Sequence, residues 1–280
     1  MQTLVINPYS ATLLNALNEA IEFNLGKFFL VGDKVTIIEK CYKLNIQSKK
    51  FTIYDISEDL EIVNFSLELL KEENIDAIIF GDFPEKYQNK ILNCEDEKCY
   101  RSLEIIDIPF LKHFLFVSSY SKDHVIDYDD KKLAILNAKR IMNSLGIKQL
   151  NVALISNLNA KVDFLEASVI DVILKKEGIK NIKIYDNFNI YNLFLVNSKV
   201  NIFNSKINLL IFKNYEASQI FIDTLKTFAN TKIANFILGD VYGMNENRFK
   251  DQSDILFGLI ILNKIHKAKL NHKELNVETG

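Results

Sequence analysis

Short apolar runs alternate along the chain with longer stretches that begin or end with helix-capping residues. This alternation restricts the folds that the chain can adopt. The runs are continuous and lack a polar/apolar alternation. Continuous runs of this length are typical of strands that are covered on both faces, as in parallel sheets. The predicted strands span residues 27–31, 51–54, 77–80, 114–117, 151–155, 182–185, 208–212 and 234–238.

The stretches between these runs predict helices, because capping residues flank them. Ser10 and Asp33 stand where an N-cap residue belongs, and Gly146 and Gly178 stand where a helix ends. The predicted helices span residues 10–23, 33–44, 57–73, 129–145 and 163–177. The regular strand–helix order predicts an α/β fold with doubly wound sheets and right-handed crossovers.

The length of the chain predicts two lobes. A chain of 280 residues exceeds the size at which one hydrophobic core stops growing. Polar stretches at 118–130 and 240–251 interrupt the pattern and place the boundaries. We therefore expect residues 1–126 plus 240–280 to form a first α/β lobe, and residues 127–239 to form a second lobe inserted into it.

The composition is that of an ordinary globular protein, with 48% hydrophobic and 25% charged residues. A net charge of -2 favours neither nucleic acid nor an anionic membrane as a partner.

The longest apolar run, 255–262, is far shorter than the ~20 residues that cross a bilayer, so it predicts a buried helix. The first residues lack the basic and apolar regions of a signal peptide. We expect a cytoplasmic protein without a membrane partner.

The cysteines and the missing motifs exclude several kinds of chemistry. The three cysteines form no CxxC pair, which fits a reducing compartment. Cys41 is interpreted as a small buried hydrophobe, and Cys94 and Cys99 lack a second ligand pair, so we expect no metal site. The chain contains no GxGxxG, GxxxxGK[ST], HExxH or GxSxG motif. Its four histidines are scattered and are interpreted as structural or solvated.

Several segments, in order, resemble the phosphate acetyl/butyryltransferase family, also called phosphotransacetylases and phosphotransbutyrylases. The matching segments are FFLVGD at 28–33, DAIIFG at 76–81, FLFVSS at 114–119, SLGI at 144–147, VALIS at 152–156, KIYD at 183–186, INLLIF at 207–212, NYEA at 214–217 and ANFILG at 234–239. Asn247, Arg248 and Asp251 fall near the family's "SRAD" motif. The resemblance covers most of the chain from about residue 27.

This resemblance implies a phosphate acyltransferase that moves a short acyl group, butyryl or acetyl, between coenzyme A and inorganic phosphate. Coenzyme A is then a substrate, and no metal is needed. The resemblance also implies two doubly wound α/β/α lobes with a cleft between them. That architecture is like the one of isocitrate and isopropylmalate dehydrogenases. The resemblance to the family also implies a homodimer.

The reaction requires a fixed cation for phosphate and a base for the thiol of coenzyme A. Arg248 stands in a polar loop just before an apolar helix and matches the family's arginine. Asp251 is the general base that the resemblance implies, and it is equally a helix cap in front of Asp254. Asn247 replaces the family's serine and keeps an amide that can donate a hydrogen bond.

Further residues match the family's phosphate and coenzyme A contacts. Arg101 resembles the arginine of the family's "GRLLSH" segment, and it is alternatively a surface residue on a loop. Gly81 ends the segment that resembles "ADALMKG". Ser118 and Ser119 stand where the family has Thr-Asp, and Asp186 keeps the acid of "DGP".

Departures from the family pattern leave other functions open. Phe80 replaces the family's lysine, and Phe188 replaces a proline, so either ring is a candidate to narrow the cleft. The alternative function is a catalytically impaired relative that binds coenzyme A, a phosphorylated metabolite or a protein partner. A dehydrogenase of similar architecture is a third option, although the chain lacks the expected clusters of metal-binding acids.

Overall fold

The structure is a computed structural model that describes residues 1–72, 75–93, 101–120, 128–155, 164–204, 206–212, 215–249 and 251–278. The chain divides into two compact units. Unit 1 contains Met1–Tyr100 and Ile233–Gly280, and unit 2 contains Arg101–Lys232. One part is thus inserted into the other along the chain. The sequence-based boundaries lie at 126/127 and 239/240, and they stay a prediction.

Unit 1 is built on a sheet with the strand order β3-β2-β1-β4-β11-β10. The first five of these strands are parallel, and β10 runs antiparallel to β11. The strands are β1 (Gln2–Ile6), β2 (Lys27–Gly32), β3 (Thr52–Asp55), β4 (Ala77–Phe80), β10 (Lys232–Leu238) and β11 (Tyr242–Asn245).

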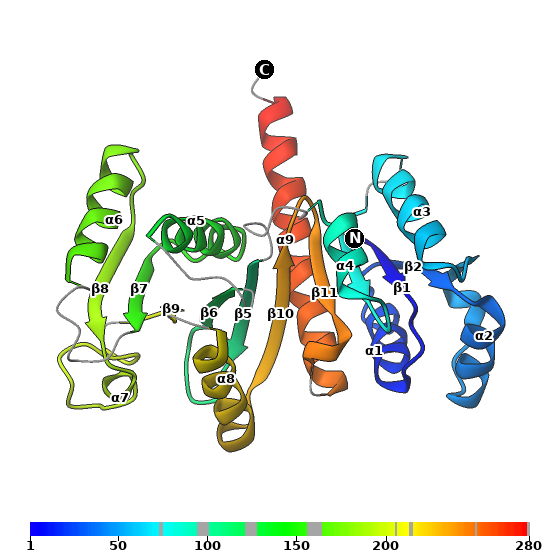
Figure 1. The fold of residues 1–280 in the computed structure, drawn as a ribbon, viewed down its shortest axis with the longest axis horizontal. Coiled ribbons are helices and arrows are strands. Elements are labelled where there is room, and N and C mark those ends of the chain that lie inside the picture. Colours follow the sequence, from blue (N-terminus) through cyan, green and yellow to red (C-terminus); the bar gives the residue numbers. More distant parts are fainter. Residues whose placement is uncertain are drawn as a thin grey trace. The chain divides into compact units, whose positions relative to one another are not determined.

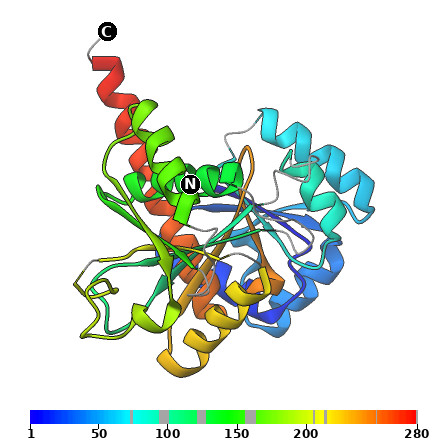
Figure 2. The same cartoon turned by 60° about the vertical axis from the view of Figure 1, so that its left-hand side comes forward.

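Helices cover both faces of this sheet (Figures 1 and 2). The helices of unit 1 are α1 (Ala11–Glu22), α2 (Lys34–Lys43), α3 (Asp59–Glu72), α4 (Glu85–Ile91) and α9 (Gln252–Glu278), with short 3-10 turns η1 (Ser48–Lys50) and η3 (Glu246–Arg248). On one face, α3 and α4 pack over a buried apolar cluster that includes Ile6, Ile78 and Phe80. On the other face, α1 packs against α9.

The two predicted N-caps are confirmed. The Ser10 side chain accepts a hydrogen bond from the Leu13 N–H at 3.0 Å and starts α1. The Asp33 carboxylate accepts one from the Thr36 N–H at 2.6 Å and starts α2. Each cap satisfies a backbone donor that has no partner inside the helix.

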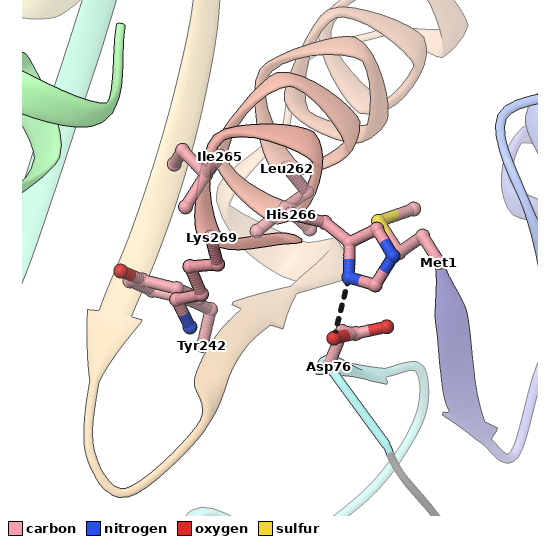
Figure 3. A pocket seen from close by; sticks show the side chains of 7 residues that line it. All are labelled: Met1, Asp76, Tyr242, Leu262, Ile265, His266 and Lys269. Atoms are coloured by element: carbon pink, nitrogen blue, oxygen red, sulfur yellow. Dashed lines mark hydrogen bonds and ion pairs between the residues drawn. The ribbon is translucent and has the colours of Figure 1, made fainter. Parts of the chain in front are cut away.

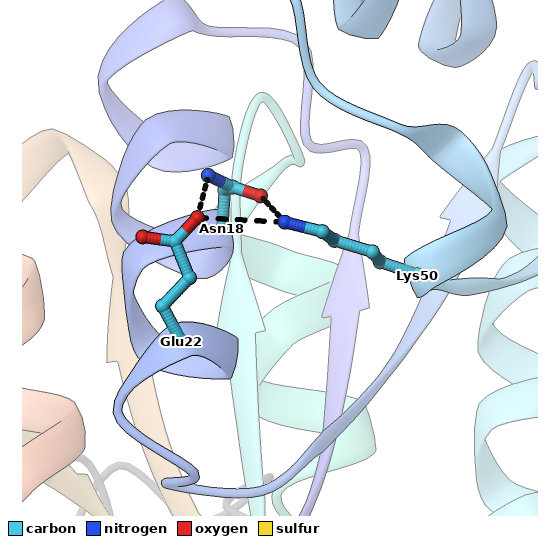
Figure 4. Close-up of polar contacts among 3 residues, drawn as sticks. All are labelled: Asn18, Glu22 and Lys50. Atoms are coloured by element: carbon cyan, nitrogen blue, oxygen red, sulfur yellow. Dashed lines mark hydrogen bonds and ion pairs between the residues drawn. The ribbon is translucent and has the colours of Figure 1, made fainter.

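A polar contact ties η1 to the last turns of α1 (Figure 4). Lys50 Nζ lies 2.8 Å from Asn18 Oδ1 and 3.4 Å from Glu22 Oε1. Glu22 is exposed, with 59% of its side-chain surface accessible. Exposed ion pairs of this kind contribute at most about 1 kcal/mol to the free energy of unfolding.

The strands of unit 2 follow one another in the order β5-β6-β9-β7-β8. β5 runs antiparallel to β6, and the other neighbours are parallel. The strands are β5 (Arg101–Asp107), β6 (Leu115–Tyr120), β7 (Leu150–Ile155), β8 (Ile182–Phe188) and β9 (Leu209–Ile211), and the helices are α5 (Tyr128–Ser144), α6 (Phe164–Lys176), α7 (Ile190–Leu193) and α8 (Tyr215–Ala229). α5 contacts β6, β9 and β7, α6 contacts β8, and α8 contacts β6.

Every predicted strand and helix corresponds to an observed one, and the α/β fold class is confirmed. Gly146 and Gly178 lie just beyond α5 and α6 with φ of 78° and 73°, a conformation that favours glycine at a helix end. The prediction missed β1, β5 and β11 among the strands. The stretch 240–251 was expected to be a polar interruption, which is wrong for the residues of β11.

Candidate functional site

The carboxyl ends of four parallel strands meet at one edge of the unit 1 sheet. Val31 of β2, Ile6 of β1, Phe80 of β4 and Asn245 of β11 lie in one row of the pairing register. We call the residues that follow this row, from all four strands, the carboxyl edge of unit 1. Because β1 leads into a helix on one face and β4 into a helix on the other, this is where ligands bind in open α/β sheets.

Two loops come very close together at this edge. The Gly81 N–H donates to the Ile6 carbonyl oxygen at 2.8 Å, and Asn7 Nδ2 donates to the Asp82 carbonyl oxygen at 3.0 Å. Asn7 adopts φ of 47°. A Cβ atom on Gly81 would lie 2.1 Å from the Asn7 carbonyl oxygen. Only glycine therefore fits at position 81 without moving the backbone.

A serine and a glutamate from opposite ends of the chain bind each other at the carboxyl edge. The Ser10 hydroxyl donates a hydrogen bond to Glu246 Oε1. Burial raises the pKa of Glu246 above its ordinary value, and the charge of Asp82 acts in the same direction. The hydrogen bond from Ser10 and the charge of Lys40 lower that pKa and oppose the shift.

A tyrosine completes this edge beside β2. The Tyr9 hydroxyl accepts a hydrogen bond from the Asp33 N–H at 2.8 Å. Burial raises the pKa of Tyr9, and the charges of Asp33, Asp82 and Asp55 add to the shift, while the hydrogen bond from Asp33 opposes it. The edge thus combines two half-buried hydroxyls with several carboxylates.

The predicted residues of unit 1 lie close together in the segment after β11. Asn247 is exposed, and its N–H donates to Asn245 Oδ1 at 2.9 Å. Arg248 is half-buried and ends η3. Asp251 is exposed, and its Oδ1 accepts hydrogen bonds from the Asp254 N–H at 3.0 Å and from Ser253 Oγ at 2.6 Å. Asp251 therefore caps α9, and its role as a base stays a prediction.

The predicted residues of unit 2 lie in the strands β5, β6 and β8. Ser118 and Ser119 lie near the end of β6, opposite Leu103 and Ser102 of β5. Arg101 begins β5, so the alternative that it lies on a loop is wrong. Asp186 lies in β8. The strands β9 and β7 lie between β8 and β6, so β8 is three strand spacings of about 4.8 Å each away from β6.

Some expectations concern parts of the chain that the structure leaves undescribed. Cys94, Cys99 and His124 lie outside the described residues. For Arg101, Ser119, Asp186 and His272 the backbone is described and the side chain is not. Their proposed roles therefore rest on the sequence and on the strand register.

The two phenylalanines that replace family residues are buried. Phe80 is fully buried in the cluster under α3 and α4, with its ring 6.4 Å from that of Phe83. Phe188 is 6% exposed. Phe80 thus packs into the core of unit 1 and leaves the carboxyl edge uncovered by its ring.

The opposite, amino-terminal edge of the unit 1 sheet contains a pocket (Figure 3). The pocket is lined by Met1, Asp76, Tyr242, Leu262, Ile265, His266 and Lys269. His266 Nδ1 lies 2.7 Å from Asp76 Oδ1, and Asp76 Oδ2 accepts the Gln2 N–H at 2.8 Å. These contacts tie α9 to the starts of β4 and β1, so His266 has a structural role, as expected.

Sequence reasoning missed the acidic partner at the carboxyl edge. Ser10 was recognised only as a helix cap, and Glu246 was not singled out. Its position two residues before Arg248 was the available signal. In the part of the chain that the structure describes, no cluster of three His, Cys, Asp or Glu side chains is placed to hold a metal ion. Nor does any described helix combine the length and apolarity that a membrane span needs.

The chain resembles known proteins over most of its length, although no family model matches it. A phosphate butyryltransferase from Clostridium beijerinckii is 23% identical, and the match covers 81% of this chain and 80% of that protein. The crystal structure of a branched-chain phosphotransacylase from Enterococcus faecalis has a TM-score of 0.73 at 11% identity and covers 95% of this chain and 99% of that one.

Two further solved structures bear on the fold. A phosphotransacetylase from Staphylococcus aureus has a TM-score of 0.68 at 13% identity, covering 95% of this chain and 94% of that one. An isocitrate dehydrogenase from Methylococcus capsulatus has a TM-score of 0.52 at 9% identity, covering 96% and 87%. The dehydrogenase-like α/β architecture expected from the sequence is therefore confirmed.

Proposed function

Because the chain is a divergent relative of the phosphate acetyl/butyryltransferases, we propose that it transfers a short acyl group between coenzyme A and inorganic phosphate. The likeness to a phosphate butyryltransferase over 81% of this chain carries the proposal. The place of Arg248 supports it, since this residue follows β11 at the edge where open α/β sheets bind ligands.

Arg248 is proposed to bind the phosphate. A guanidinium has a planar fork of donors that grips two oxygens of an anion at once. Asn247, next to it, offers an exposed amide that can donate a hydrogen bond to the acyl oxygen as charge develops there. Asp251 is the base that the family resemblance implies, and its carboxylate also caps α9.

The remaining contacts with phosphate and coenzyme A are proposed from the position of each residue in the paired strands. Gly81 allows the close backbone approach that shapes the carboxyl edge of unit 1. In unit 2, Arg101 is proposed as a second cation for the phosphates of coenzyme A, with Ser118, Ser119 and Asp186 as polar contacts. The scarcity of cysteine supports a reducing cytoplasm as the place of action. The homodimer is proposed from the family resemblance alone.

Product trapping tests the proposed function. The purified full chain is incubated with phosphate and either butyryl-CoA or acetyl-CoA, and hydroxylamine then converts any acyl phosphate to a hydroxamate. We expect a hydroxamate only when phosphate is present. If neither acyl-CoA yields a phosphate-dependent hydroxamate, the chain is not an acyltransferase of this kind.

A further inference from the structure

Two carboxylates flank Arg248 in the sequence, and their surroundings differ. Asp251 is exposed, and the first turn of α9 occupies its Oδ1 with two hydrogen bonds. Glu246 is half-buried at the carboxyl edge of unit 1, where Ser10 donates to its Oε1. Among the described residues, the second carboxylate oxygen of Glu246 accepts no hydrogen bond.

We propose that Glu246, in place of the Asp251 that the family resemblance implies, is the general base of the acyl transfer and that Ser10 positions its carboxylate. This inference rests on the proposed function. When acyl phosphate reacts with coenzyme A, Glu246 takes the proton of the thiol as the sulfur–carbon bond forms. The bond between the acyl carbon and the phosphate oxygen then breaks, and Glu246 returns the proton to the leaving phosphate. The reverse reaction uses the same two proton transfers.

The position of Glu246 follows from the sheet. Asn245 pairs with Phe80, so Glu246 leaves β11 beside Gly81 and Asp82 of the neighbouring strand end. Ser10 follows β1 on the next strand and accepts the Leu13 N–H, which directs its own proton toward Glu246. Ser10 thus holds one oxygen of the carboxylate and leaves the other to accept a proton.

The charged groups around Glu246 act on its pKa in both directions, and burial has the largest effect. Asp82 faces it from the end of β4, Lys40 faces it from α2, and Arg248 lies on the same turn. Burial raises the pKa of Glu246, which brings it nearer to neutral pH. A general base is most effective when its pKa lies near the working pH.

The test is the pH profile of kcat/KM for acyl transfer in variants of the full chain. Glu246→Gln should lower kcat/KM at least about 100-fold and remove the acid limb of the profile. Ser10→Ala should move that limb to higher pH, because the lost hydrogen bond stabilised the carboxylate. Asp82→Asn should move it to lower pH, because a neighbouring negative charge is gone.

Two controls separate these effects from folding. Ser10→Thr keeps a hydroxyl and an N-cap and should keep the limb where it is. Glu22→Gln changes an exposed carboxylate at the end of α1 and should leave the profile unchanged. Circular dichroism spectra establish that each variant is folded.

The outcomes distinguish this inference from the proposed function. An active wild-type chain whose Glu246→Gln variant keeps both its rate and its acid limb overturns the role of Glu246 alone. Loss of the acid limb in Asp251→Asn, with the limb retained in Glu246→Gln, also overturns it and makes Asp251 the base. A wild-type chain without acyl transfer overturns the proposed function, and this inference with it.

Discussion

Ser10 and Glu246 are 236 positions apart in the sequence, and the Ser10 hydroxyl donates a hydrogen bond to Glu246 Oε1. The contact joins the loop after β1 to the turn after β11 within unit 1. Glu246 and Arg248, both half-buried, lie on one turn. This turn follows a strand end of the kind at which open α/β sheets bind ligands.

Replacing Glu246 with glutamine should stabilise the protein at neutral pH. Glutamine is neutral and keeps an oxygen that can accept from Ser10. Burial raises the pKa of Glu246 above its ordinary value of 4.5, so the fold favours the protonated carboxyl. The stability that this preference gives is present at low pH and is lost as pH rises through the raised pKa. The variant's gain in melting temperature should therefore grow with pH.

Melting temperatures between acid and neutral pH check this expectation for wild type, Glu246→Gln and the exposed control Glu22→Gln. A difference between wild type and Glu246→Gln that stays constant with pH would show that burial of the charge costs the fold nothing.

Asp251 should stabilise the folded protein because its side chain caps the first turn of α9. Asp251→Ala leaves the Asp254 N–H without its side-chain acceptor and should lower the free energy of unfolding by about 0.5–2 kcal/mol. Asp251→Asn should be nearly neutral, since asparagine is an equally good N-cap residue. Urea denaturation of both variants measures the difference. Equal losses in the two variants would contradict a capping role.

Gly81 should not tolerate alanine. The added Cβ would lie 2.1 Å from the Asn7 carbonyl oxygen, so the backbone must move. Overpacking of this kind costs about 1–3 kcal/mol or more, and here it also displaces the loop that carries Ser10. Melting temperature and kcat/KM should both fall. Gly146→Ala is the control: it strains a φ of 78° in unit 2 and should lower stability without lowering kcat/KM.

An unchanged kcat/KM in Gly81→Ala would mean that the close approach of the two loops does not shape the site.

Much of the fold could be predicted because its signals are local. The run at 77–80 coincides with β4, and the caps at Ser10 and Asp33 start α1 and α2 as expected. β11 was missed because Tyr-Gly-Met-Asn carries no apolar run. It is a strand because β4 and β10 pair with it on either side. Its Gly243 packs closely against the core, since a Cβ there would lie 2.8 Å from Leu92.

The candidate site could be predicted only in part, because only some of its residues carry a local signal in the sequence. Arg248 and Asn247 were predicted from a short motif, which is local in the sequence, and their roles stay a prediction. The pairing of Ser10 with Glu246 depends on the order of strands β1, β4 and β11 in the sheet. No pattern within either segment contains that order, so the pair emerges only from the fold.

The contact between the Asp76 carboxylate and the His266 ring should support stability without supporting catalysis. It lies in the pocket at the amino-terminal edge of the unit 1 sheet (Figure 3). The proposed site lies at the carboxyl edge. Asp76→Ala removes the acceptor for both His266 and the Gln2 N–H, and should cost about 1–3 kcal/mol of unfolding free energy. Urea denaturation measures this loss, and kcat/KM of the folded variant should equal that of wild type. A folded Asp76→Ala variant with a large loss of activity would contradict this division between the two edges.

Release of the coenzyme A thiol from butyryl-CoA, with and without phosphate, tests the central claim most directly when wild type and Arg248→Ala are compared. Wild type should release thiol only with phosphate, and Arg248→Ala should release it at least about 100-fold more slowly with little change in melting temperature. Arg140→Ala, which changes an exposed arginine of α5, should behave like wild type. Equal phosphate-dependent rates in wild type and Arg248→Ala would contradict the claim that Arg248 binds phosphate in an acyl transfer.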